Sequence, residues 1–519
     1  MTVASPVPKT INSLPKEILA LIFEEVFAAS RDLELDSPEQ LKDPTLFPYC
    51  IAGVCRAWKK IVQSIPSLST RIVLKIDVPI CMTELRDQLK LSKGYSINFY
   101  VVRESYEDTG DESEKPIVQV LMQALIPHIT RCKVVVFDLL YSTSLPRIRD
   151  FRGNATELRT LRMRSRHYTG SYTSTAISSS TSLSTSRKKF GVFTCPNLQY
   201  LDLDGHVFME AVQIPGWDAS LRTRYQKHLT ISNLTTSQFD LRDFLNALSQ
   251  MDHLASLKLV DVDLDSSSCV GNDLISIFIQ NFHFIGLRRE FVASFFANHA
   301  NTIDVSSLIL DQCELTEVPY LAVWRLSLEN IAQEEDVSSI IKHWDGIELK
   351  LRRCPGLNDK DIDLLTEFQP PQMANFYAPT LRQLEISACG PVSVKAINNL
   401  VYMRDAESKV HDSTVDEGPG LNMFSVFVYD TDVPISKEDY TWLTKAVENF
   451  TWCMKCPPPA EDSPILDWDC SQMDLSQLDE LPAFALDSTP PEPQSSQLSD
   501  SPVLSDDYAL LDWAEVDLP

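Results

Sequence analysis

The chain has 519 residues, and its 46 Lys and Arg against 72 Asp and Glu give a formal net charge of −26. From residue 456 onward there are 15 acidic residues and no Lys or Arg, so residues 1–455 hold 57 acids against 46 bases. This balance argues against general binding to nucleic acid, which needs clustered Lys and Arg. Glycine is scarce, with 15 residues, and neither G-x-G-x-x-G nor G-x-x-x-x-G-K-[ST] occurs, which argues against the main nucleotide-binding motifs.

No uninterrupted run of 18 apolar residues is present, so the sequence predicts no membrane span. The first residues lack the basic region and the apolar run of a signal peptide. The 12 cysteines are scattered, as is typical of reduced thiols. We therefore expect the protein in the cytoplasm, the nucleus or both.

The first seventy residues predict two helices, around 15–27 and 46–62, separated by a charged segment that contains Pro38 and Pro44. Apolar residues recur at helical spacing in both. In the first they are Ile18, Leu19, Ile22, Phe23, Val26 and Phe27, and in the second Phe47, Cys50, Ile51, Val54, Trp58 and Ile61. Two short helices have too little volume to bury both stripes, so some apolar surface should remain for a partner.

Short β-like runs follow at 72–76, 95–102 and 134–139, and the pattern predicts a helix at 118–129 between the last two. From residue 158 a motif recurs in which Leu is followed after two residues by Leu and after one more by an aliphatic residue. Clear copies are Leu158/Leu161/Met163, Leu198/Leu201/Leu203, Leu254/Leu257/Leu259 and Leu381/Leu384/Ile386. Weaker copies are Val305/Leu308/Leu310, Val323/Leu326/Leu328 and Gly346/Leu349/Leu351.

In such a motif the alternating aliphatic side chains point inward from a strand, and neighbouring repeats stack to close a common core. The final positions of the copies are separated by 40, 56, 51, 18, 23 and 35 residues, so the long gaps should hide degenerate copies, one of them at Leu229-Thr-Ile231. The alternative is an ordinary set of α/β strands in which Leu recurs by chance.

Charged residues between the inward aliphatics belong to the exposed strand face and are candidates for contact with a protein substrate. They are Lys258, Arg325, Glu348, Lys350, Arg352 and Glu385. Solvated surface is the alternative interpretation of the same set.

Three polar segments, near 104–116, 165–189 and 404–420, predict flexible inserts because they are too polar to offset their ordering entropy. Residues 456–519 contain 10 of the 31 prolines and predict a disordered acidic tail. Within it, Ile465-Leu-Asp-Trp-Asp469 and Leu510 to Asp517 mix Leu and Trp with acids. Such segments either bind a hydrophobic groove on a partner or simply keep exposed Trp in solution.

The N-terminal residues resemble an F-box, whose pattern is Leu-Pro-x-Glu and Ile-Phe on a first helix and Val-Cys-Arg-x-Trp on a second. The matching residues here are Leu14-Pro15-Lys16-Glu17, Ile22-Phe23, Val54-Cys55-Arg56-Ala57-Trp58 and Pro66-Ser67-Leu68. The stretch from Ala28 to Thr45 is longer than in the compact pattern, as in large fungal F-box-like proteins, and Ser69 replaces a common aromatic residue.

The repeats resemble the cysteine-containing leucine-rich type that often follows an F-box. Leu349-Lys-Leu351-Arg-Arg-Cys354 fits best, and Cys313 and Cys389 occupy the corresponding positions of two other copies. We expect these cysteines to be small buried side chains at the turn that leaves each strand.

The sequence therefore predicts an α/β protein in three parts. Residues 1–72 form a small all-α F-box, residues 73–455 an irregular leucine-rich-repeat solenoid of horseshoe type, and residues 456–519 a disordered tail.

The resemblance implies the substrate-recognition subunit of an SCF-type ubiquitin ligase, which binds a Skp-family adaptor and, through it, a cullin scaffold. The implied adaptor-binding residues are Leu14, Pro15, Ile18, Ile22, Val54, Cys55 and Trp58. For Ile22 and Val54, packing of the two helices on each other is the competing role. The alternatives are a repeat scaffold without ligase activity and a regulator whose acidic tail recruits a transcriptional partner.

No catalytic motif such as H-E-x-x-H or G-x-S-x-G occurs, so we expect a non-catalytic protein without a cofactor. Cys453-Met-Lys-Cys456 is an isolated pair that lacks the second pair of a structural zinc site, so no metal is expected.

Overall fold

A computed structural model describes most of the chain up to Lys455. The described residues are 11, 14–32, 38–43, 46–106, 113–167, 193–214, 227–251, 254–266, 275–300, 305–317, 321, 323–367, 378, 380–411 and 425–455. By contacts the chain divides into residues 1–456 and 457–519. The predicted tail, 456–519, lies outside the described residues.

The N-terminal region is helical, as predicted, but its second helix is divided. The elements are α1 (Lys16–Asp32), α2 (Pro38–Lys42), α3 (Tyr49–Val54), α4 (Arg56–Ser64) and the 3-10 turn η2 (Pro66–Ser69). The predicted continuous helix over 46–62 is wrong because Cys55 has extended backbone, with φ −159° and ψ 167°, and its Sγ accepts the N–H of Trp58 as the N-cap of α4.

These helices have a small core of their own. Buried Leu19, Phe23 and Phe27 of α1 pack with Phe47 before α3 and Val62 of α4. The module joins the rest of the chain at Arg71, whose carbonyl accepts the hydroxyl of Tyr49 at 2.9 Å. The Arg71 guanidinium in turn donates to the carbonyl of Phe47 at 3.1 Å.

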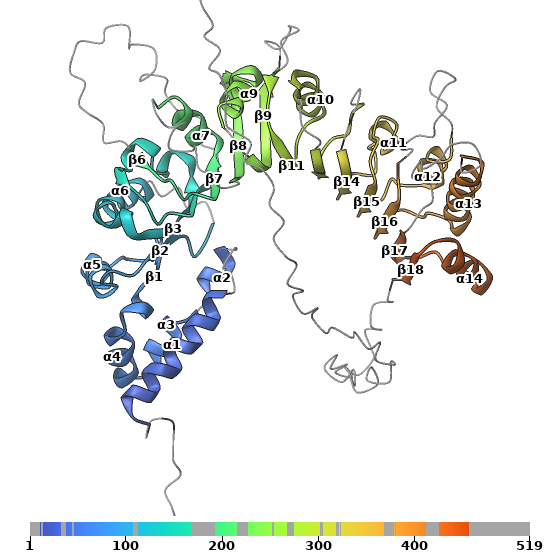
Figure 1. Cartoon of the computed structure of the whole chain (residues 1–519). Helices are drawn as coiled ribbons and strands as arrows, with labels where there is room; N and C mark the ends of the chain where they lie inside the picture. The colour runs from blue at the N-terminus through green and yellow to red at the C-terminus, as the bar shows by residue number, and fades with distance from the viewer. Residues whose placement is uncertain are drawn as a thin grey trace, which may run out of the picture. The chain divides into compact units, whose positions relative to one another are not determined.

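The remaining described residues form an α/β array around one all-parallel sheet of 14 strands (Figure 1). The first seven strands are β1 (Arg71–Lys75), β2 (Ile97–Val102), β3 (Cys132–Tyr141), β5 (Thr160–His167), β7 (Tyr200–Asp204), β8 (Lys227–Asp240) and β9 (Leu254–Asp265). The others are β11 (Ile279–Ile285), β13 (Val305–Asp311), β14 (Val323–Glu329), β15 (Glu348–Arg352), β16 (Gln383–Ser387), β17 (Ser425–Thr431) and β18 (Asn449–Met454). Each strand pairs with the next one in this order.

Helices connect many of these strands and cover one face of the sheet (Figure 1). They are α5 (Met82–Leu91), α6 (Glu114–Leu125), α7 (Gly205–Val212), α9 (Leu241–Ser249), α10 (Arg289–Asn298), α11 (Ser338–Ile341), α12 (Asp359–Leu364), α13 (Val394–His411) and α14 (Lys437–Ala446). Short 3-10 turns are η3 (Ile126–Arg131), η4 (Ser142–Ser144) and η5 (Ile148–Asp150). Two small sheets pair β4 (Gly153–Asn154) with β6 (Phe193–Thr194) and β10 (Ile275–Ser276) with β12 (His299–Ala300).

The strands bury one face, as the leucine motif predicts. In β13, for example, Val305, Leu308 and Leu310 are buried in the common core, whereas Ser306 is exposed. All seven predicted motif copies end in one of these strands. This arrangement is consistent with a leucine-rich-repeat-like solenoid.

Two long gaps in the predicted repeat pattern contain degenerate strands. Leu229 and Ile231 occupy β8, so the 56-residue gap between Leu203 and Leu259 is divided in the middle. Phe282 and Phe284 occupy β11, which divides the next gap in the same way. The β11 copy escaped prediction because aromatic residues replace leucine there.

Eight strands have a residue with left-handed backbone at the equivalent turn position, two residues after an inward-facing apolar side chain. The residues with positive φ, between 51° and 64°, are Asn233, Asp261, Gly286, Gln312, Asn330, Arg353, Ala388 and Asp430. The cysteines predicted at these turns lie there: Cys313 and Cys354 are buried and Cys389 is half-buried. The Cys354 thiol donates to the carbonyls of Arg352 and Leu328, each at 3.4 Å, so it also serves as a hydrogen-bond donor between strands.

The predicted inserts are shorter than expected where they can be described. Buried Glu114 begins α6 inside the first insert, because Arg103 lies 3.4 Å from its carboxylate. Residues 165–167 belong to β5, and α13 continues to His411 with Arg404 fully buried. The parts at 107–112, 168–192 and 412–424 lie outside the described residues.

A further interaction links the long segment between α1 and α3 to the sheet. Leu41 of α2 is buried against Tyr100, Val102 and Val136, on the strand face opposite to the main core. Sequence patterns assigned no structure to this segment. None of the described helices is long and apolar enough to cross a membrane.

Candidate functional site

An unpartnered apolar stripe runs along α1. Helical spacing places Leu19, Phe23 and Phe27 in the core and leaves a second set of aliphatic residues on another side of the helix. These exposed residues, which we call the α1 stripe, are Leu14 just before the helix and Ile18, Leu21, Ile22 and Val26 within it. Their side chains are 38% to 58% exposed, which is far more than the core residues of the same helix.

The α3–α4 junction adds further exposed positions. Val54, the last residue of α3, is 61% exposed, and Cys55 is exposed at the cap of α4. Trp58 is half-buried, and its ring centroid lies 5.1 Å from that of Phe23 in the core. Trp58 therefore holds α4 against α1 as well as presenting part of its ring to solvent.

Six of the seven predicted adaptor-binding residues are exposed, and the exception, Trp58, is half-buried. The exposure of Ile22 and Val54 argues against their competing role in helix packing, because other residues form that core. Leu21 and Val26 were not among the predicted adaptor-binding residues, although their three- and four-residue spacing from Ile18 and Ile22 was a usable signal.

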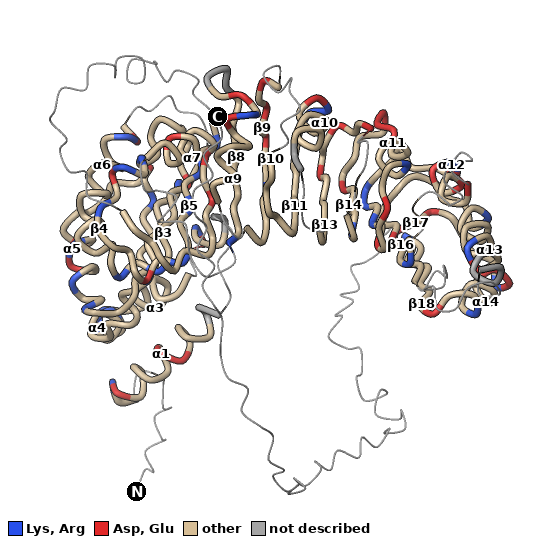
Figure 2. The backbone as a smooth tube through the Cα atoms, turned by 45° about the horizontal axis from the view of Figure 1, so that its top comes forward, with Lys and Arg blue, Asp and Glu red and all other residues tan. Residues whose placement is uncertain are grey.

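A second candidate surface is the open face of the strands, opposite to the main core. Five of the six predicted substrate-contact residues form one network there across β14, β15 and β16, which we call the ion ladder. Figure 2 marks where basic and acidic residues lie along the backbone. Arg325 pairs with Glu348 at 2.9 Å. Lys350 bridges Glu348 and Glu385 at 2.9 Å and 3.5 Å, and Arg352 pairs with Glu385 at 2.6 Å.

The charged groups of the ion ladder are paired with one another. Hydrogen bonding to Glu348 raises the pKa of Lys350, and hydrogen bonding to Glu385 raises the pKa of Arg352. Both cations therefore stay charged, and a substrate would have to compete with existing carboxylate partners for them. Lys258 lies on β9 and is not part of this network.

Another charged cluster occupies the open face of β3, β5 and β7. Asp202 of β7 lies 3.0 Å from Arg162 and 2.5 Å from Arg164. On the other side of β5, Arg166 lies 3.6 Å from buried Asp138, whose carboxylate also accepts the hydroxyl of Tyr106 at 2.8 Å. Burial raises the pKa of Asp138.

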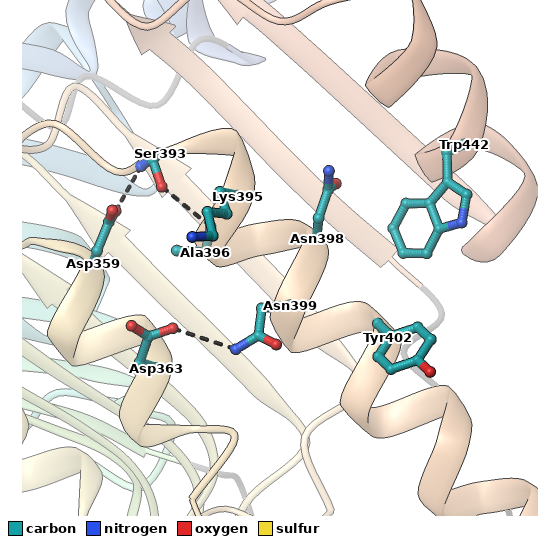
Figure 3. Close-up of a pocket in the computed structure, with 9 residues that line it drawn as sticks. All are labelled: Asp359, Asp363, Ser393, Lys395, Ala396, Asn398, Asn399, Tyr402 and Trp442. Atoms are coloured by element: carbon teal, nitrogen blue, oxygen red, sulfur yellow. Dashed lines mark hydrogen bonds between the residues drawn. The ribbon is translucent and has the colours of Figure 1, made fainter.

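A pocket of about 680 Å³ lies on the helical side, between α12, α13 and α14 (Figure 3). Its polar groups mainly join these helices: Asp359 accepts the N–H of Ser393 at 2.6 Å, and the Ser393 hydroxyl accepts the N–H of Ala396 at 3.1 Å. Tyr402 and Trp442 line it with exposed aromatic rings. The residues around this pocket therefore have a structural role that explains their contacts.

A pocket of about 690 Å³ lies where the last strands end, and Arg352 and Glu385 of the ion ladder line it together with Tyr429 and Cys453. Cys453 is exposed on β18, and Cys456 lies outside the described residues. Among the residues that the structure describes, no group of three or more His, Cys, Asp or Glu side chains is arranged to hold a metal ion.

Comparison with known proteins gives no assignment: no protein-family model matches this chain, and no curated protein matches it.

Proposed function

We propose that this chain is the substrate-recognition subunit of an SCF-type ubiquitin ligase. In this proposal residues 1–72 are an F-box that docks a Skp-family adaptor, and the strand array is an irregular leucine-rich-repeat solenoid that binds the protein to be modified. The chain would form no covalent bond itself. It would hold its substrate near the ubiquitin-loaded enzyme on a cullin, so that effective concentration replaces a bimolecular search.

The observation that carries the proposal is the α1 stripe together with exposed Val54. Aliphatic residues that are exposed on a helix at regular spacing are typical of a groove-binding or helix-packing interface. Each such side chain contributes on the order of 1 to 2 kcal/mol when a partner removes it from water. The sequence pattern around Leu14, Pro15 and Val54 adds the identity of the expected partner.

The test is co-expression of the full chain with a Skp-family adaptor, followed by purification through the chain. We expect the wild-type chain to retain adaptor and cullin. The double variant Ile18→Asp, Val54→Asp should lose both, because it places two carboxylates in an apolar interface. Neither residue belongs to the core of the helical module, so the variant should still fold.

A matched control is Val120→Asp on α6, which introduces a carboxylate at a position that is 44% exposed and far from α1 in sequence. It should retain adaptor binding, and circular dichroism should show all variants folded. A wild-type chain that fails to bind the adaptor would contradict the proposal. The same result, with other partners bound through the strands, would favour the scaffold without ligase activity.

A further inference from the structure

The open strand face differs in charge pairing along the sheet. In the ion ladder on β14–β16 every Lys and Arg has a carboxylate within 4.0 Å. On β5, Arg162 and Arg164 share Asp202, and Arg166 has Asp138. Lys258 differs: among the described residues, no carboxylate lies within ion-pairing distance of its ammonium group.

The sheet register places Lys258 in the middle of a row of polar side chains. Its direct neighbours across the ladder are Thr230 on β8 and His283 on β11. All three are half-buried on the open face, between Asp202 on β7 and Ile309 on β13 in the same row. Neighbouring strands are about 4.8 Å apart, so an ammonium, a hydroxyl and an imidazole lie within reach of one incoming group.

The environment of Lys258 leaves its charge poorly compensated. Burial lowers its pKa, and the positive charge of Arg164 lowers it further, while Asp202 and Asp311 act in the opposite direction. Burial and the charge of Lys258 likewise lower the pKa of His283. Asp202 is already shared by two arginines, and Asp311 lies two strands away and accepts a hydrogen bond from Asn330 at 2.7 Å.

An exposed aromatic contact surface lies one row away on the same strands. Tyr200 of β7 is 46% exposed, and its ring stacks on that of His228 of β8 with centroids 4.8 Å apart. His228 Nδ1 lies 2.8 Å from the hydroxyl of Ser256 on β9, which fixes the ring. The strands β7 to β9 thus present a rigid aromatic pair beside a half-buried cation.

We propose that a protein partner binds across β7–β11 as an extended segment that places an Asp or Glu carboxylate against Lys258, with an apolar side chain on Tyr200. This inference rests on the proposed function only in taking the bound partner to be the substrate that the strand array selects. Five of the six predicted substrate-contact residues lie in the ion ladder. The inference instead assigns the main substrate contact to the sixth, Lys258.

The charge count favours a carboxylate over the other anions. Arg162 and Arg164 share Asp202, and Asp311 accepts a hydrogen bond from Asn330. The single positive charge of Lys258 therefore lacks a close carboxylate among the residues that the structure describes, and one carboxylate neutralises it. A phosphorylated side chain carries about −1.5 to −2 at neutral pH and would leave the site negative. A nucleic acid would need several phosphate contacts, and one unpaired Lys cannot supply them.

The test uses immobilised ten-residue peptides of alternating Ser and Val with one central Glu. Matched peptides carry Gln or phosphoserine at that position, and a single-stranded oligonucleotide completes the set. Full-length wild-type protein should prefer the Glu peptide to the Gln peptide by about tenfold, and Lys258→Gln should remove that preference. Lys350→Gln, which neutralises a cation that already has carboxylate partners, is the matched control and should retain it.

Equal binding of Glu and Gln peptides by wild-type protein, or a preference that survives Lys258→Gln, would overturn the inference. Stronger Lys258-dependent binding of the phosphoserine peptide or the oligonucleotide would overturn it in favour of those ligands. Adaptor co-purification separates this result from the proposed function. Lys258→Gln should still retain the adaptor, and Ile18→Asp, Val54→Asp should still bind the Glu peptide.

Discussion

Asp204 illustrates how a single residue supports the array. It ends β7, accepts the N–H of His206 as the N-cap of α7, and accepts the hydroxyl of Ser165 on β5 at 2.7 Å. Its side chain is fully buried, and burial raises its pKa to about 6. Burial also lowers the pKa of His206. The motif Leu198/Leu201/Leu203 predicted the strand but not this carboxylate, because hydrogen bonding to β5 requires the chain to return some forty residues later.

The raised pKa predicts a pH dependence. Between the usual aspartate pKa near 4 and the folded value of about 6, the folded chain holds a proton that the unfolded chain has lost. Stability from this group is therefore complete below pH 4 and is lost as the pH rises through about 6. In Asp204→Asn the amide oxygen can still accept the N–H of His206, the amide nitrogen can donate to the Ser165 hydroxyl, and the side chain does not ionise.

Relative to wild type, the free energy of unfolding of Asp204→Asn should increase by about 3 kcal/mol between pH 4 and pH 8. Urea denaturation of both proteins at several pH values measures this difference. A difference that is independent of pH would show that the Asp204 carboxyl titrates normally.

At the scale of the single element, close packing at turns decides which sequence a repeat accepts. The copy Gly346/Leu349/Leu351 begins with glycine where the others have leucine or valine, and the structure gives the reason. A Cβ at Gly346 would overlap the carbonyl oxygen of Val323 and lie 2.6 Å from Trp344 Nε1. That indole is buried and donates to the same carbonyl at 2.7 Å, so β14 and the segment before β15 are joined by this contact.

Gly346→Ala should therefore destabilise the protein by about 1 to 3 kcal/mol, because the added methyl group displaces Trp344 from its hydrogen bond. The matched control is Gly53→Ala in α3, where nothing lies within 4 Å of the new Cβ. There a gain of about 0.5 to 1 kcal/mol is expected, because alanine favours the helix. Thermal unfolding followed by tryptophan fluorescence measures both, and equal effects of the two substitutions would contradict the packing argument.

In the described part of the chain, up to Lys455, two main hydrophobic cores divide the stability, and a small third cluster around Leu41 lies between α2 and the sheet. The helical module packs around Phe23, whereas the strands share one continuous core that includes residues from Ile72 to Trp452. Because each strand pairs only with its neighbours in the sheet order, the array is stabilised locally along its length. The contacts of Arg71 with Phe47 and Tyr49 join the two parts.

Phe23→Ala should lower the stability of the helical module by about 3 to 5 kcal/mol and leave the strand array folded. Hydrogen exchange followed by mass spectrometry should then show faster exchange in α1 and α4 and unchanged exchange in β11–β16. Phe244→Ala, which removes a fully buried ring of α9 from the other core, should have the opposite distribution. Faster exchange in both parts after Phe23→Ala would show that the two cores unfold together.

The sequence by itself determined the features that depend on local periodicity. Leu at fixed spacing placed seven of the strands, because alternation directly reflects which face a strand buries. Helical spacing in α1 grouped Phe23 with Ile18 and Ile22 on one stripe, and only the structure separates buried Phe23 from the two exposed residues. The buried position of Cys354 at the end of its strand was expected from the resemblance to cysteine-containing repeats. The break at Cys55 and the helical start at Glu114 were not, because a cap hydrogen bond and a buried ion pair override the local pattern.

Only the tertiary structure decided which charges meet. Lys258 and Lys350 occupy the same position in their repeats, and Lys350 pairs with Glu348 of its own strand. On the adjacent strands Lys350 has Ser327 and Glu385 as neighbours, whereas Lys258 has Thr230 and His283. Those neighbours are set by the pairing of strands that are tens of residues apart, through repeats of unequal length. A side chain's sequence neighbours fix the face it occupies and can supply a partner on its own strand, as Glu348 does for Lys350. Its partners on the adjacent strands are known only when the sheet register is known.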